Sequence, residues 1–218
     1  MHVTVERIDV RQAHYTDPEE VREIADVDSG DVLFDISPRL VADRVARLPW
    51  VRKAGVTRLP TGKLLISLRE REPVALALGT DGRETFYLDR DGYQMPAVDG
   101  ASFDVPLVSG YPESFHPVKP TDDSLVLQVL DALDREAEGA GILISEVLLR
   151  DGECWLQLEP TGERGSTPVR LGRDEIRDKL VRLTAFWNQR VLPGQDSRFD
   201  LIDLRFSSRI ITQEENRD

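Results

Sequence analysis

Few residues of this sequence could do chemistry, and the histidines are the first to consider. There are three, His2, His14 and His116. Each falls in a predicted terminus or loop, and none has a second ligand-type residue at the spacing of a metal motif. A hydrolytic triad also needs a base, usually histidine, beside its nucleophile. The pattern favours solvated loop histidines over a metal or hydrolytic site.

The most suggestive acidic motif is Asp89-Arg90-Asp91-Gly92. Calcium loops begin with alternating aspartates before a glycine, but the remaining oxygen ligands and the closing glutamate are missing here. An Asp-Gly pair between two short β-like runs is typical of a hairpin turn. No glycine-rich phosphate loop is present either. We therefore expect a turn at 89–92, with no metal.

Glu70 and Glu72 could be read as the paired acids of a glycosidase. In a strand they would point to one face while Arg69 and Arg71 point to the other. This pattern predicts a solvated, salt-bridged sheet edge. The sequence therefore predicts no catalytic residue, no metal ligand and no cofactor, which disfavours an enzyme but leaves that alternative open at this point.

Composition limits the possible partners. The 218 residues include 40 acidic and 28 basic side chains, which gives a formal net charge of −12. General nucleic-acid binding and adhesion to anionic lipid are disfavoured, because both depend on clustered Lys and Arg. The single cysteine, Cys154, excludes an intramolecular disulfide and lies in a strand-like run, where we expect a buried structural thiol. A 40% hydrophobic share is enough for packed cores.

The elements of the first part follow from caps and periodicity. Residues 3–10 are β-rich, and Thr16-Asp17-Pro18-Glu19 has the pattern of a capping box at a helix start. Ser37-Pro38 predicts the start of a second helix. One face of that helix is predicted to carry four apolar residues: Leu40, Val41, Val45 and Leu48.

After Pro49 the period changes from helical to alternating. Residues 55–60 and 63–71 read as two strands joined by a turn at Thr61-Gly62. The first part is thus predicted to be β-α-α-β-β, one small sheet with two helices on a face. The boundaries of this domain are predicted at 1–72.

The second part, predicted over 73–213, mixes short strands with two helices. Thr121 is predicted to cap the first helix, whose apolar stripe is Leu125, Val126, Val129, Leu130 and Leu133. Three strands at 144–150, 154–160 and 168–172 form a predicted meander. The last helix carries Ile176, Leu180, Leu183 and Trp187 at helical spacing. The fold class is α+β, with a mainly antiparallel second sheet and a disordered tail at 214–218.

One feature points to binding. We predict that Phe199–Gln213 forms a long last strand with no following segment to cover it. A terminal strand at a sheet edge offers free N–H and C=O groups to another chain. Its outer half carries Phe206, Ser208, Ile210 and Ile211, which either contact a partner or pack on their own domain. The pattern alone leaves both readings open.

At this point the sequence resembles a known family, the bacterial cell-division proteins called FtsQ or DivIB. The first part resembles the POTRA domain of that family in "GDVLFD" (30–35), "LPWV" (48–51), "RLP" (58–60) and "EREPVA" (70–75). The second part follows the family order in "FYLDRDGYQMP", "DVPLVSG", "VRLGRDEIRDKLVRL" and "IDLRFSSRIIT". The resemblance covers nearly all 218 residues.

The resemblance implies a non-enzymatic scaffold at the division septum. It implies a single-pass inner-membrane protein, with an anchor upstream of this chain and this region on the extracytoplasmic side. It further implies that the second domain binds FtsB and FtsL by strand addition beside its last strand, and that the POTRA domain contacts other division proteins. By motif alignment, Arg173, Phe206 and Ser208 are the partner-binding residues that the resemblance implies, and the outer half of the predicted last strand adds Ile210 and Ile211.

An alternative is a POTRA-containing envelope assembly or secretion protein. Such proteins carry several POTRA units before a barrel of many strands. Here a single predicted unit is followed by a mixed α/β part, which speaks against this alternative. An envelope hydrolase with a POTRA-like domain is a more distant alternative. A single apolar span of about 20 residues directly upstream would favour the division protein.

Overall fold

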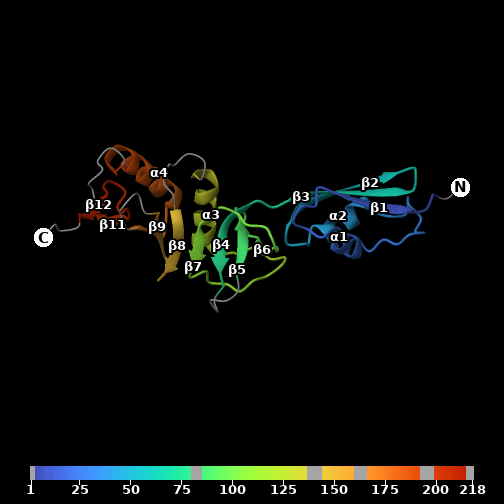
Figure 1. Cartoon of the computed structure of the whole chain (residues 1–218), viewed down its shortest axis with the longest axis horizontal. Helices are drawn as coiled ribbons and strands as arrows, with labels where there is room; N and C mark the ends of the chain where they lie inside the picture. The colour runs from blue at the N-terminus through green and yellow to red at the C-terminus, as the bar shows by residue number, and fades with distance from the viewer. Residues whose placement is uncertain (1–2, 80–84, 137–143, 160–165, 192–198, 215–218) are drawn as a thin grey trace. The chain divides into compact units, whose positions relative to one another are not determined.

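The computed structural model describes residues 3–79, 85–136, 144–159, 166–191 and 199–214 (Figure 1). The chain divides into two compact units. The first comprises Met1–Glu72, Gln94–Ser102 and His116–Lys119, and the second comprises Pro73–Tyr93, Phe103–Phe115 and Pro120–Asp218. The first unit thus takes two segments from the region that sequence alone assigns to the second domain.

The first unit has the predicted order β-α-α-β-β. Its elements are β1 (Arg7–Arg11), α1 (Pro18–Ala25), α2 (Pro38–Val45), β2 (Val51–Leu59) and β3 (Lys63–Glu70). The sheet order is β1-β3-β2, with β3 parallel to β1 and antiparallel to β2. The helices pack on one face through a buried apolar cluster that includes Val21, Val45 and Ile66.

Both helices start at a capped proline, but one cap differs from its prediction. The Ser37 side chain accepts a hydrogen bond from the Leu40 N–H at 3.4 Å, as predicted. In α1 the cap is Asp17, which accepts from the Glu19 N–H at 2.8 Å, because the Thr16 hydroxyl donates elsewhere. Of the four apolar residues predicted on one face of α2, Leu40 is 52% exposed and lies outside the buried cluster.

Glu70 corrects the prediction of a salt-bridged edge. Because β3 is the central strand, Glu70 lies inside the unit, with a side chain only 8% exposed. Its carboxylate accepts hydrogen bonds from the backbone N–H groups of His14, Tyr15 and Thr16 at 2.8–3.0 Å and from the Thr16 hydroxyl at 2.8 Å. Arg71 is also buried, and its Nε donates to the Pro49 carbonyl at 3.1 Å. These side chains close the unit instead of facing solvent.

The second unit is built on the larger sheet. The strands of this sheet are β4 (Pro73–Leu78), β5 (Thr85–Asp89), β6 (Gln94–Pro96), β7 (Leu107–Ser109), β8 (Ile144–Arg150), β9 (Glu153–Leu158), β10 (Thr167–Gly172), β11 (Phe199–Asp203) and β12 (Ile211–Glu214). All of them except β6 belong to the second unit. They form one nine-stranded sheet in the order β12-β11-β10-β9-β8-β7-β4-β5-β6. The pairing is mixed: β4–β7, β7–β8 and β10–β11 are parallel.

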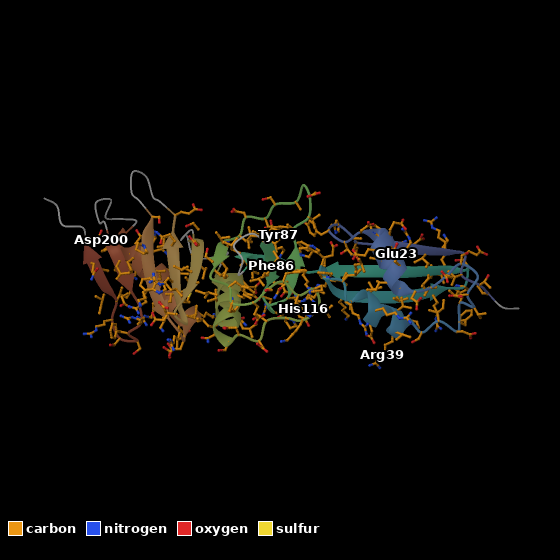
Figure 2. The ribbon with its side chains drawn as sticks, turned by 90° about the horizontal axis from the view of Figure 1, so that it is seen from below. Glu23, Arg39, Phe86, Tyr87, His116 and Asp200 are labelled. Carbon is orange, nitrogen blue, oxygen red and sulfur yellow. The ribbon has the colours of Figure 1, made fainter. Side chains whose placement is uncertain are left out.

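Two helices, α3 (Ser124–Glu136) and α4 (Ile176–Phe186), supply the core of this sheet, and a π-helical turn, η1 (Trp187–Val191), continues α4. The predicted apolar residues of both helices belong to this core, including Val126, Leu130, Leu180 and Trp187. Phe86 and Tyr87 are neighbours on β5 (Figure 2). Phe86 packs edge-to-face with Tyr111, whereas Tyr87 packs with Phe103. The α+β fold class is therefore confirmed.

The predicted turn at 89–92 is also present. The Asp89 carboxylate accepts hydrogen bonds from the backbone N–H groups of Asp91 and Tyr93, and Gly92 has a φ of +82°. A Cβ at Gly92 would lie 2.6 Å from Thr121 Cγ2, so the close approach of two chain segments requires glycine. The carboxylate of Asp123, not the side chain of Thr121, caps α3 by accepting from the N–H groups of Leu125 and Val126.

Cys154 is fully buried in the core of the second unit, as predicted. Burial raises the pKa of its thiol to about 12, and the nearby positive charge of Lys179 offsets only part of that effect. The thiolate that would act as a nucleophile is therefore almost absent at neutral pH.

Candidate partner-binding edge

The single last strand predicted over Phe199–Gln213 is wrong. The segment forms a hairpin of β11 and β12, joined by residues 204–210. Asp203 ends β11, because its Oδ1 accepts the backbone N–H of Arg205 at 3.0 Å and turns the chain. Glu214 belongs to β12 and not to the predicted tail, while residues 215–218 lie outside the described ranges.

β12 is the last strand of the nine-stranded sheet, and within the described ranges only β11 pairs with it. The Leu204 N–H donates to the Arg170 carbonyl of β10 at 2.9 Å, so the backbone groups of residue 204 point toward β10. Because these directions alternate along a strand, those of Asp203 point toward β12. Asp203 pairs with Ile211, so Ile211 and Gln213 bond to β11.

The alternation leaves Thr212 as the residue of β12 whose N–H and C=O point away from the sheet. Thr212 itself pairs with Ile202, whose side chain is fully buried. The Thr212 side chain thus lies on the core face of the sheet, while Ile211, which is 39% exposed, lies on the opposite face. An extended chain added here would find one free backbone donor and one free acceptor at the centre of β12.

The connection 204–210 is held from α4. An Nη of Arg182 donates to the carbonyl of Phe206 at 2.7 Å and lies 3.4 Å from the carbonyl of Arg209. The Phe206 ring is 39% exposed, and the guanidinium groups of Arg205 and Arg209 lie 5.8 and 5.0 Å from its centre. These contacts fix an aromatic side chain and two cations beside the start of β12.

Asp203 and Arg205 form the charged centre of this end of the sheet. Nε of Arg205 lies 3.1 Å from both carboxylate oxygens, and an Nη lies 2.7 Å from Oδ2. Burial acts to raise the pKa of Asp203, but the hydrogen bonds from Arg205 and the charges of Arg205 and Arg170 outweigh it. The pKa of Asp203 therefore lies below its ordinary value of 3.8.

The five residues predicted to bind a partner lie in different settings. Phe206 and Ser208 are exposed in the connection, Ile210 packs partly against the core, and Ile211 begins β12. Arg173 follows β10 and donates to the Asp151 carbonyl at 2.9 Å. Because β10 and β11 are parallel, Arg173 and the residues after Asp203 lie at the same end of the sheet.

Three residues of this edge were not identified from the sequence: Arg182, Asp203 and Thr212. The signals for the turn are an aspartate two residues before an arginine and the pair Ser207-Ser208, which favours turns. Nothing in the sequence indicates that Arg182 reaches the connection, because 24 residues separate it from Phe206.

The described residues contain no group of three or more metal-ligating side chains, counting His, Cys, Asp and Glu. Nor does any helix within the described ranges combine the length and apolar character needed to cross a membrane. The buried Lys179 ammonium pairs with Asp174 at 2.7 Å, which lowers the pKa of that carboxyl. The arrangement at β12 offers hydrogen-bonding groups and an exposed aromatic ring, which is the chemistry of peptide binding.

Comparison with known proteins assigns both parts of the chain. Residues 3–71 match the family described as POTRA domain, FtsQ-type, and residues 72–213 match FtsQ/DivIB, C-terminal related. A protein of Rhodothermus marinus named "Cell division protein FtsQ" is 47% identical over 98% of this chain and 78% of its own length. Proteins of the same name from Salinibacter ruber and Geotalea daltonii are 38% and 26% identical, over 97% and 96% of this chain and 83% and 75% of their own lengths.

Proposed function

This chain belongs to the FtsQ/DivIB family of cell division proteins, and from this premise we propose that it is a non-enzymatic scaffold of the bacterial divisome. Its second domain binds the division proteins FtsB and FtsL, and its POTRA domain contacts further division proteins. An upstream segment anchors the protein in the inner membrane, with residues 1–218 on the extracytoplasmic side at the septum.

The observation that carries the proposal is the outward direction of the Thr212 backbone on an edge strand. A strand of FtsB placed beside β12 would pair with this N–H and C=O and extend the sheet by one strand. Main-chain hydrogen bonds then supply much of the affinity. Ile202 of β11 and Leu204 of the connection are fully buried in the core and anchor this edge.

Side chains around β12 set the register of the added strand. Phe206 and Ser208 contact it where the connection enters β12, and Ile211 contacts it on the face opposite the helices. Ile210 supports this contact from the core side. Arg173 borders the same end of the sheet and is exposed, so it is available to a carboxylate of the partner.

The test is a backbone substitution in β12. Thr212→Pro removes the outward N–H but leaves the pairs of Ile211 and Gln213 with β11 in place. Binding of the extracytoplasmic part of FtsB to this chain is then measured by titration calorimetry. We expect the dissociation constant to rise at least about tenfold, the factor for one lost hydrogen bond with an unsatisfied partner.

The matched control is Thr212→Val, which keeps the N–H and nearly the shape of the side chain. Thermal unfolding of both variants shows whether the hairpin is still formed. If Thr212→Val binds normally and Thr212→Pro does not, strand addition accounts for the binding. Equal affinity of Thr212→Pro and the unsubstituted chain would refute it.

A further inference from the structure

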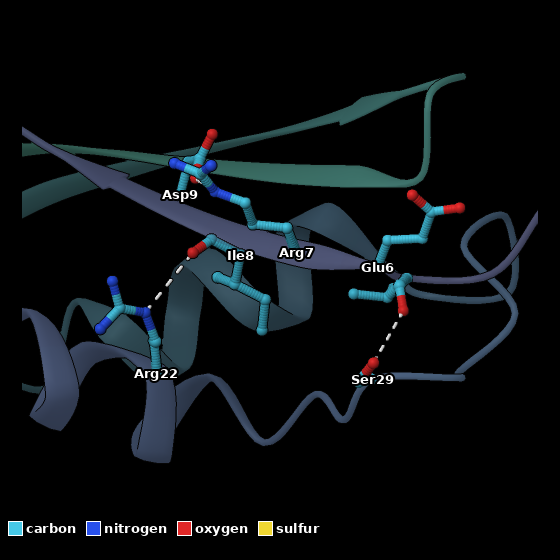
Figure 3. Close-up of a pocket in the computed structure, with 7 residues that line it drawn as sticks. Glu6, Arg7, Ile8, Asp9, Arg22 and Ser29 are labelled. Atoms are coloured by element: carbon cyan, nitrogen blue, oxygen red, sulfur yellow. Dashed lines mark hydrogen bonds and ion pairs between the residues drawn. The ribbon is translucent and has the colours of Figure 1, made fainter.

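The three-stranded sheet of the first unit has a face that no helix of the described residues covers. The alternation along β1, β2 and β3 directs Ile8, Val10, Ile66 and their neighbours into the core under α1 and α2. The opposite face therefore carries the intervening residues, which are Arg7, Asp9, Arg11, Lys53, Gly55, Thr57, Leu59, Lys63, Leu65, Ser67 and Arg69. Figure 3 shows this division on β1, where Arg7 and Asp9 lie on one side of the strand and Ile8 on the other.

This open face is basic, whereas the chain as a whole carries a net charge of −12. Its cations are Arg7, Arg11, Lys53, Lys63 and Arg69, and Asp9 is its carboxylate. Arg7 forms an ion pair with Asp9. Among the described residues, no carboxylate forms an ion pair with the other four cations. The remaining positive charge is therefore available to a ligand.

Two of these cations, Lys53 and Arg69, lie where they destabilise the sheet. Lys53 and Arg69 are directly opposite each other in the β2–β3 register, and both are exposed. Like charges at opposed positions of an antiparallel pair destabilise the sheet. A carboxylate between them would relieve the repulsion, which is a reason to expect an anionic partner at this place.

The centre of the open face carries no charged side chain, and two of its residues, Gly55 and Ser67, are small. Gly55 lies opposite Ser67, and Thr57 lies opposite Leu65. Lys63 and Arg69 flank this centre along β3, and six residues of strand separate them by about 20 Å. A helix spans that distance in about 13 residues. The spacing suits a helical segment with carboxylates at both ends and small or apolar residues between them.

The sheet edge at β1 is less suited to a partner than the face. The N–H of Arg7 donates to the Gly62 carbonyl, so the backbone groups of Arg7 point toward β3. Because these directions alternate along a strand, the backbone groups of Ile8 point away from β3. Nε of Arg22 on α1 lies 3.4 Å from the Ile8 carbonyl and donates to it (Figure 3). This donor blocks one acceptor that a strand added at β1 would need.

We propose that the open face of the β1-β3-β2 sheet docks an acidic helical segment of another protein. The juxtaposition of unpaired cations around the Gly55–Ser67 centre selects this partner. A bilayer or a nucleic acid is disfavoured, because each presents negative charge over an area wider than the face and meets the net negative charge of the chain. The proposal concerns the first unit and does not depend on β12.

The test uses a defined probe, an alanine-based helical peptide of about 16 residues with two glutamates at each end. Its binding to the full chain is followed by amide chemical shifts and by titration at low and high salt. We expect the shifted resonances to lie on β1, β2 and β3, and the affinity to fall as salt rises. The same peptide with lysines replacing the glutamates should not bind.

Lys53→Gln with Arg69→Gln removes the opposed cations and should weaken binding of the acidic peptide about fivefold. The matched control is Arg39→Gln with Arg47→Gln, because both arginines are exposed but belong to the helical side of the unit. Figure 2 shows the Arg39 side chain pointing away from the first unit. The control should bind normally. Failure of the acidic peptide to bind, equal affinity of the double variant, or binding of phosphatidylglycerol vesicles in place of the peptide would overturn the proposal.

Discussion

The two sheets of this protein expose different parts of the polypeptide. In the first unit, β1, β3 and β2 present side chains on an open face, and Arg22 occupies an acceptor at the β1 edge. In the second unit, β12 presents backbone groups at the end of a nine-stranded sheet. The first is a surface of charges, and the second offers the backbone N–H and C=O of Thr212. We expect charge removal to impair binding at the first and proline to impair binding at the second.

Glu70 in the first unit and Asp203 in the second are carboxylates that each hold a turn, with different partners. Glu70 accepts three backbone N–H groups and a hydroxyl from the segment before α1. Asp203 accepts one backbone N–H and faces a guanidinium group that is itself partly exposed. Glu70 therefore has more to lose from substitution, because its backbone donors are fixed in the fold.

The largest expected effect is that of Glu70→Ala. It leaves several donors without their acceptor and should lower the free energy of unfolding by about 3 kcal/mol. Asp203→Ala should cost about 1 kcal/mol, since Arg205 can turn to solvent. Urea unfolding of both variants measures the difference. Equal losses would contradict this ranking of the two turns.

Acid should affect the two turns in the same order. Burial acts to raise the pKa of Glu70, but hydrogen bonds from residues 14–16 outweigh it, so the pKa lies below 4.5. A carboxyl whose folded pKa is lowered stabilises the protein above its unfolded pKa and loses that contribution as pH falls through the folded value. The losses begin below about pH 4.5 for Glu70 and about pH 3.8 for Asp203.

The measurement is the stability of the chain between pH 6 and acid, compared with Glu70→Gln and Asp203→Asn. Each substitution should remove its own part of the pH dependence. The pH at which the unsubstituted chain first loses stability should move down in Glu70→Gln and stay unchanged in Asp203→Asn. An unchanged curve for Glu70→Gln would show that another group titrates.

Arg182→Ala tests how far the connection 204–210 supports the β12 edge. It releases the carbonyls of Phe206 and Arg209, and we expect a loss of about 1 kcal/mol in stability and about threefold weaker binding at β12. Val181→Ala is the control, because its side chain is 45% exposed on the same helix. Binding that is unaffected in Arg182→Ala would mean that the connection does not determine the edge.

The smallest expected effect is that of Arg22→Ala. The hydrogen bond to the Ile8 carbonyl is long, and the side chain is partly exposed, so stability should change by less than about 0.5 kcal/mol. Binding of the acidic peptide should be unchanged, since Arg22 lies on the helical side of β1. A clear loss of peptide affinity would place the basic site at the edge and not on the face.

Local signals in the sequence identified most of the elements but not their pairing. Ser37-Pro38 and Asp91-Gly92 were interpretable because a cap and a tight turn are fixed by neighbours in the chain. The central position of β3 could not be interpreted from the sequence, because β1, which pairs with it, is separated from it in the chain by two helices. Glu70 was therefore assigned to a sheet edge. Sheet order depends on contacts between distant segments, which period-two patterning does not encode.

The candidate edge shows the same limit. Ile202, Leu204 and Phe206 alternate as a strand would, yet Asp203 binds the Arg205 N–H and Arg182 binds the Phe206 carbonyl. Both interactions end the strand, and the second comes from a helix earlier in the chain. The family was recognised from ordered motifs, and the comparisons confirm it. The free backbone of Thr212 could be located only once the pairing of β10, β11 and β12 was known.

The most direct test of the two-surface account is a crossed binding measurement. Thr212→Pro and the pair Lys53→Gln with Arg69→Gln are each titrated with the extracytoplasmic part of FtsB and with the acidic peptide. The account predicts that Thr212→Pro loses FtsB binding and keeps the peptide, while the double variant does the reverse. If either variant weakens both ligands equally, the two surfaces are not separate and the account is wrong.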